Sequence, residues 1–146
     1  MKRAMATIAL AALSVPVPAL AWLGGDAASI KADRQHMNAT VVTAAAGNYT
    51  RFEIHTPSGT LLTEYLSPSG RVFAVAWKGP ALPDLRQALG GFFSRYIAAG
   101  EAQGLGRRVI EEPGLVVHAG GHMRAFVGRA FIPESIPQGV SVEDIR

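Results

Sequence analysis

Two histidines in the last third of the chain have a spacing that could support metal chemistry. His118 and His122 flank Ala119-Gly120-Gly121, and a hairpin turn at the glycine pair would place the two imidazoles opposite each other. A zinc site needs three or four ligands, and only His55 or Glu53 from a distant strand could complete this one. We therefore predict that both histidines face solvent at strand ends, and that the chain has no metal site and no cofactor.

Acyl transfer would require a nucleophile, a base that contacts it and a carboxylate that orients the base. Both candidate serines lie in Pro-Ser-Gly turns, which is reason enough for their presence, and no Gly-x-Ser-x-Gly elbow occurs. We therefore predict no catalytic residues. The weighed candidates are Ser58 or Ser69 as nucleophile, His55 or His118 as base, and Asp84 or Glu64 as orienting acid.

A tryptophan beside a proline-bounded loop is the better candidate for binding. Trp77 ends an apolar segment, and the loop from Lys78 to Pro83 follows it directly. A tryptophan in such a place offers a large contact face and one N–H donor, and loops often carry binding residues. The predicted binding residues are Trp77, Lys78, Pro80 and Asp84.

A β-meander must position this loop. Two matching turns, Thr56-Pro57-Ser58-Gly59 and Ser67-Pro68-Ser69-Gly70, separate segments rich in β-forming residues. We expect strands over residues 49–56, 60–66 and 71–77, the last of them apolar on both sides and therefore central in the sheet.

A long helix should follow the meander. It is predicted from about Asp84 to about Gly100, and its apolar stripe stays in phase across Gly90-Gly91. A short helix over 26–37 and a strand over 40–45 should precede the meander, and strands over 108–111, 115–118 and 122–132 should follow the helix, the last with a bulge at Gly128. The fold class is thus α+β: an antiparallel β-meander sheet, one long amphipathic helix packed on it and a short N-terminal helix. The expected shared core is Phe52, Ile54, Phe73, Val75, Leu85, Leu89 and Phe92.

The first 21 residues have the pattern of a signal peptide. Lys2 and Arg3 precede an uncharged apolar run, and Ala19-Leu20-Ala21 is a processing site. The run is about half the roughly 20 residues of a membrane span, so no stable span should remain after cleavage. We expect residues 22–146 to form a single exported domain, with a frayed tail from about residue 139.

Charge argues against a nucleic-acid partner. The full chain has 14 Lys and Arg against 11 Asp and Glu, and removing residues 1–21 takes away two of the basic residues and no acidic one. The remaining net charge is only +1, far from a nucleic-acid footprint. The chain has no cysteine, which suits a location in the periplasm or outside the cell.

Several short motifs resemble a known family. They are Leu23-Gly24-Gly25-Asp26, Pro57-Ser58-Gly59, Glu64-Tyr65, Ser67-Pro68-Ser69-Gly70, Val72-Phe73-Ala74-Val75-Ala76-Trp77 and Gly79-Pro80 with Pro83-Asp84-Leu85. Together they are similar to the small exported bacterial proteins catalogued as domain of unknown function 2844, from Leu23 to about Tyr96. The resemblance implies a bacterial, Gram-negative envelope setting and brings no catalytic residues.

The sequence favours a non-enzymatic binding or accessory module of the bacterial envelope, with a protein or polymer as its partner. The alternative is a small periplasmic hydrolase that uses His118 and His122, or His55, together with Asp84. An enzyme should gather a base, an acid and a nucleophile in one cleft, whereas a binding module should show a contiguous contact surface.

Overall fold

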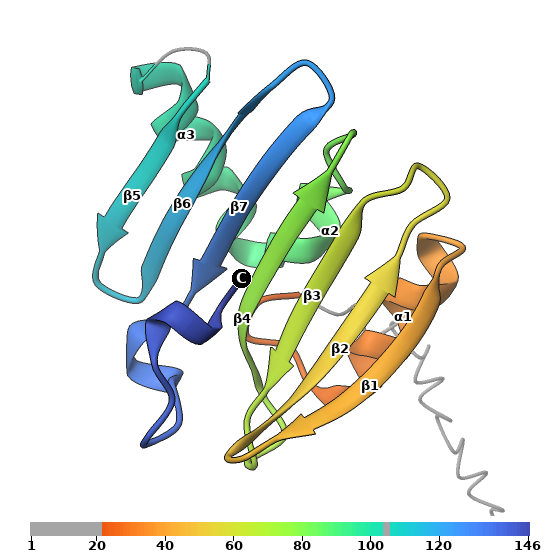
Figure 1. Ribbon diagram of the computed structural model, residues 1–146. Helices are drawn as coiled ribbons and strands as arrows, with labels where there is room; N and C mark the ends of the chain where they lie inside the picture. Colours follow the sequence, from red (N-terminus) through yellow and green to blue (C-terminus); the bar gives the residue numbers. More distant parts are fainter. Residues whose placement is uncertain (1–21, 104–105) are drawn as a thin grey trace, which may run out of the picture.

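The computed structural model describes residues 22–103 and 106–146, which form one antiparallel sheet in the order β1-β2-β3-β4-β7-β6-β5 (Figure 1). The predicted signal peptide lies outside the described residues. The α+β meander is confirmed. The strands are β1 (Thr40–Ala46), β2 (Tyr49–His55), β3 (Leu61–Leu66), β4 (Val72–Gly79), β5 (Arg108–Glu112), β6 (Leu115–His122) and β7 (Ala125–Phe131). The helices are α1 (Ala27–His36), α2 (Leu85–Leu89), η1 (Gly90–Phe92), α3 (Phe93–Gln103), η2 (Pro133–Ser135) and η3 (Val142–Asp144).

The two matching turns close by the same local chemistry. The Thr56 hydroxyl donates to the Thr60 carbonyl at 2.9 Å and accepts from the Thr60 amide at 3.1 Å. The Ser67 hydroxyl repeats this arrangement with Arg71 at 3.0 and 3.3 Å. Each turn ends in a glycine with positive φ, which side chains rarely adopt. Because these bonds span only four residues, the local sequence is sufficient to predict the turns.

All three α-helices cover one face of the sheet (Figure 1). The core on this helix-covered face joins strand residues such as Ile54 and Val75 to Leu85 and Leu89 of α2, and the half-buried Phe52 and Phe92 pack against it. Six of the seven expected core residues therefore meet on this face. The exception is Phe73.

Phe73 packs on the opposite face because β4 contains a bulge. Tyr65 pairs with Ala74 whereas Leu66 pairs with Val72, so Phe73 has no facing residue and the alternation of sides slips there. Its ring lies 6.0 Å from that of Tyr65, centroid to centroid. The predicted bulge at Gly128 was wrong, since Gly128 pairs in register with Trp77 and with the neighbouring strand β6.

The predicted long helix is interrupted where the glycine pair falls. Gly90 has a φ of 51°, and a one-turn 3₁₀ segment links α2 to α3. A Cβ at Gly90 would lie 2.3 Å from Cγ of Trp22, so the glycine admits this side chain against the helix. The apolar stripe nevertheless stays on the sheet side, where Leu89 and Tyr96 are both buried.

The last residues are not a frayed tail. Ile145 is fully buried on the face opposite the α-helices, in a cluster with Tyr65, Phe73 and Phe131. The Tyr65 hydroxyl donates to the carbonyl of Arg146 and accepts from its amide, both at 2.9 Å. The carboxyl-terminal segment thus covers one end of this face and leaves the other end open (Figure 1).

Tyr65→Phe should lower the free energy of unfolding by about 1–2 kcal/mol at neutral pH, because it removes both hydrogen bonds to Arg146. Burial raises the pKa of the Tyr65 hydroxyl above its ordinary value of 10.0, although the hydrogen bond donated by the Arg146 amide lowers it in part. The unfolded chain therefore ionises first, and this contribution to stability is present below about pH 10 and is lost at higher pH. Urea midpoints of both proteins at pH 7 and near pH 11 should converge at the higher pH; an equal gap at both would contradict the assignment.

Candidate functional site

The predicted histidine hairpin was wrong. Strand β6 runs through both glycines to His122, and the chain turns at the following two residues, where Arg124 has a φ of 64°. Gly121 is needed for close approach, because a Cβ there would lie 2.4 Å from the Ala125 carbonyl oxygen. Both histidines therefore belong to one strand, about 13 Å apart along it. His118 instead meets Glu111 of β5, with Nε2 3.1 Å from Oε1.

The weighed catalytic groups do not come together. His55 is exposed on the face opposite its buried neighbour Ile54, whereas Asp84 caps α2 on the helix-covered face, accepting from the Gln87 amide at 3.0 Å. Glu64 is buried on the helix-covered side, in register with Val75. Ser58 and Ser69 lie in turns at opposite ends of β3. Among the described residues, no three His, Asp or Glu side chains gather around a point that a metal ion could occupy.

A groove crosses the uncovered end of the sheet, over β3, β4, β7 and β6, and we call it the open-face groove. Its volume is about 1090 Å³. Two adjacent cross-strand rows make its floor, because strand pairing sets their members side by side. One row is Thr63, Ala76, Arg129 and His118, and the other is Leu61, Lys78, Val127 and Gly120.

The open-face groove is basic. Its described lining includes Lys78, Arg107, Arg129 and Arg146 with both histidines, and it includes no Asp or Glu. The carboxyl-terminal segment orients Arg129, whose Nη1 donates to the Val142 carbonyl at 2.9 Å. This concentration of positive charge contrasts with the small net charge of residues 22–146, so the charge is unevenly distributed over the surface.

Apolar side chains lie between these Lys and Arg side chains. Leu61, Ala76 and Val127 belong to the groove floor, and the side chain of Val127 is 54% exposed. The floor is open at Gly120, since nothing lies within 4 Å of where a Cβ on this residue would be. Apolar and positively charged side chains therefore alternate across the groove floor.

A second groove of about 600 Å³ lies on the other side, between α2, α3 and the ends of β6 and β7, and we call it the helix-side groove. Its walls carry two arginines stacked on aromatic rings: Arg86 lies 4.6 Å from the centre of the Phe93 ring, and Arg108 lies 4.4 Å from that of Tyr96. Both are cation–π contacts, so these rings are covered in part by side chains of the protein itself.

The four predicted binding residues do not lie in one groove. Trp77 and Asp84 both line the helix-side groove, whereas the exposed Lys78 lines the open-face groove. Pro80 lines neither and packs over Gly59. Trp77 also borders the open-face groove, but it is only 2% exposed, and its indole N–H has no hydrogen-bond partner within the described part of the chain.

Sequence analysis missed Arg107, Arg129 and Val127, three residues of the open-face groove. Arg129 could have been singled out from the sequence, because it is the one charged residue in the otherwise apolar strand Ala125–Phe131. Alternation in that strand places Arg129 and Val127 on one face and Gly128 on the other. Nothing local shows that this face meets Lys78 of β4, since that pairing joins segments about fifty residues apart.

The fold and its grooves define a class of small α+β protein, with one sheet face covered by helices and the other partly open and basic. The chain matches the model of the family described as Protein of unknown function (DUF2844) over residues 19–145, and it belongs to this family. The expected resemblance is confirmed, and it extends well beyond Tyr96. No curated protein and no solved structure matches the chain. None of the helices in the described segments is long and apolar enough to cross a membrane.

Proposed function

We propose that this protein is an exported, non-enzymatic binding module of the bacterial envelope that holds an acidic segment of a partner protein in its open-face groove. The observation that carries the proposal is the groove lining, which combines exposed apolar side chains with four Lys or Arg residues and no described acidic residue. The pattern of a signal peptide supports the extracytoplasmic setting.

The lining favours a polypeptide over a single-stranded nucleic acid. Binding of single-stranded nucleic acid depends on exposed aromatic rings that stack on the bases. Among the described residues of this lining, the only Phe, Tyr or Trp is Trp77, which is almost fully buried. An extended polypeptide in which acidic and apolar side chains alternate would match the alternation of basic and apolar side chains in the groove floor.

Among the described residues, the hydrolase alternative has no assembled site to support it. His118 and Glu111 form a base and an orienting acid, but the hydroxyl in the same cross-strand row is that of Thr63, three strands away. Adjacent strands are about 4.8 Å apart, so Thr63 lies roughly 14 Å from His118, outside hydrogen-bond reach.

Reversing charge in the groove should weaken binding of an acidic peptide. The probe is a fluorescent peptide in which Glu and Val alternate, measured by anisotropy at low salt. Lys78→Glu with Arg107→Glu should raise its Kd at least about tenfold, which corresponds to about 1.4 kcal/mol, because two attractions become two repulsions. Raising the salt concentration should weaken binding to the unchanged protein.

A matched double variant separates this groove from general charge effects. Lys31 and Arg34 are exposed on α1, on the helix-covered side of the sheet. Lys31→Glu with Arg34→Glu changes the net charge equally and should alter the Kd by less than about twofold. Equal weakening by both pairs would contradict the groove assignment, and tighter binding of a single-stranded oligonucleotide or a carboxylated polysaccharide would contradict the polypeptide partner.

A further inference from the structure

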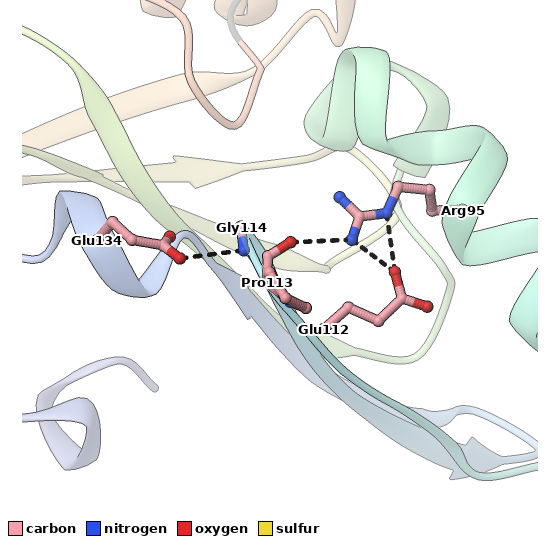
Figure 2. A network of polar contacts seen from close by, with 5 residues as sticks. All are labelled: Arg95, Glu112, Pro113, Gly114 and Glu134. Carbon is pink, nitrogen blue, oxygen red and sulfur yellow. Dashed lines mark hydrogen bonds and ion pairs between the residues drawn. The ribbon is translucent and has the colours of Figure 1, made fainter.

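The two edges of the sheet differ in charge and in protection. Strand β5 carries Arg108, Glu111 and Glu112. At its turn, Arg95 of α3 holds Glu112 at 2.5 Å and the Pro113 carbonyl at 3.3 Å, while Glu134 accepts from the Gly114 amide at 3.2 Å (Figure 2). Charged and anchored edges of this kind resist pairing with other chains.

Strand β1 forms the other edge and has none of these protections. Its sequence, Thr-Val-Val-Thr-Ala-Ala-Ala, contains no charge and no proline, and all seven residues pair in unbroken register with β2. Val42 is 50% exposed, and β2 is the only described strand beside β1. A regular, neutral edge leaves a row of backbone donors and acceptors open to another strand.

We propose that β1 pairs antiparallel with β1 of a second copy of the chain, so that two sheets join into one across a two-fold axis. Facing residues in an antiparallel pair point to the same side of the sheet, and residues alternate sides along each strand. The axis must therefore pass through a residue position. Full overlap of Thr40–Ala46 with its copy selects Thr43, which leaves all seven residues paired.

Charges on the neighbouring strand, where Arg51 and Glu53 form an ion pair at 2.8 Å, are compatible with the same register. On the open side, Arg51 lies beside Ala44 and Glu53 lies beside Val42. With the axis at Thr43, Ala44 faces Val42 of the second copy. The cross-strand row that starts at Arg51 and Ala44 of one copy therefore ends at Val42 and Glu53 of the other. An axis at Val42 would instead align the two glutamates, and an axis at Ala44 would align the two arginines.

The same features favour a second copy over an unrelated strand. A neutral strand meets itself without repulsion. Thr43 faces its own copy and the other facing pairs join Thr or Val to Ala, so no large side chain obstructs the approach. The contact is a single strand pair, smaller than the interface of a stable obligate dimer. A weak, concentration-dependent dimer follows. It does not depend on the proposed function, because β1 contributes no residue to the lining of the open-face groove.

Sedimentation velocity over a concentration series tests the dimer. Val42→Lys should raise the dimer dissociation constant at least tenfold, because it adds a charge from each copy at a neutral edge. Val127→Lys is the matched control: Val127 is 54% exposed on the same side of the sheet but lies on the inner strand β7, so its substitution should leave dimerisation unchanged. A monomer at every concentration would overturn the proposal and leave this edge to a strand of another protein. A dimer that survives Val42→Lys would overturn it as well.

Disulfide cross-linking tests the register, because the chain has no cysteine of its own. Thr43→Cys should give a covalent dimer on mild oxidation, since residues that face each other in an antiparallel pair have Cα atoms about 4.5–5.5 Å apart. Ala45→Cys, exposed on the same side of β1, would lie about 13 Å along the strand from its copy and should not cross-link. Equal cross-linking at both positions, or none at Thr43, would overturn the register.

Discussion

Leu89→Ala is expected to lower the free energy of unfolding by about 2–5 kcal/mol, enough to unfold much of a marginally stable domain. Leu89 is fully buried and belongs to the core between α2 and the sheet. Its neighbour Ala88 accepts a hydrogen bond from the Leu23 amide at 3.0 Å, so α2 is also tied to the start of the described chain. A cavity at Leu89 therefore loosens the contact between the helices and the sheet.

Urea denaturation followed by circular dichroism measures this loss. Leu82→Ala removes the same atoms from a side chain that is 52% exposed in the loop before α2, and it should change the unfolding free energy by about 0.5 kcal/mol or less. If both substitutions lowered the urea midpoint equally, or if neither did, α2 would not cover the sheet as described.

Gly128→Ala is expected to destabilise the protein by about 1–3 kcal/mol or more, although it adds only one methyl group. A Cβ at this position would lie 2.3 Å from Cζ2 and 2.5 Å from Cε2 of Trp77, and 3.0 Å from the Cβ of Ala119. Trp77 is buried in the core and has little room to move, so the strand or the ring must shift.

Gly120→Ala on the adjacent strand β6 is the control for Gly128→Ala. No atom lies within 4 Å of a Cβ at Gly120, and its φ is not in the positive range. This substitution should be neutral, or stabilising by about 0.4–1 kcal/mol, because alanine gives the unfolded chain less conformational entropy than glycine does. Urea midpoints by tryptophan fluorescence compare the two. Equal midpoints would show that Gly128 is not required by the Trp77 ring.

Local chemistry explains what could be predicted of the fold. The two hydroxyl-containing turns, the strands of the meander and the stripe from Leu85 to Tyr96 all rest on residues within a few positions of one another. The same holds for the cap that Asp84 provides for α2. Here these local signals agree with the tertiary structure, and the α+β class was predictable for that reason.

Non-local pairing explains the errors. Phe73 reverses sides because of a register shift against Tyr65, and the interruption at Gly90 accommodates Trp22, nearly seventy residues earlier. The glycines of β6 resembled a turn, but one of them allows close approach of β7 and neither ends the strand. A glycine permits a turn or a close contact equally well, so its role depends on which segment lies opposite.

Local residue patterns alone predicted the meander, the amphipathic helix and export, because each pattern lies in contiguous residues. The family resemblance likewise rests on short motifs of contiguous residues. The open-face groove required the tertiary structure, since strand pairing brings together Lys78, Arg129 and His118 from three strands. The carboxyl-terminal segment, which resembled a polar tail, proved to bury Ile145 and to orient Arg129. Its position depends on a bulge and a sheet face that only long-range contacts create, and no local pattern encodes those contacts.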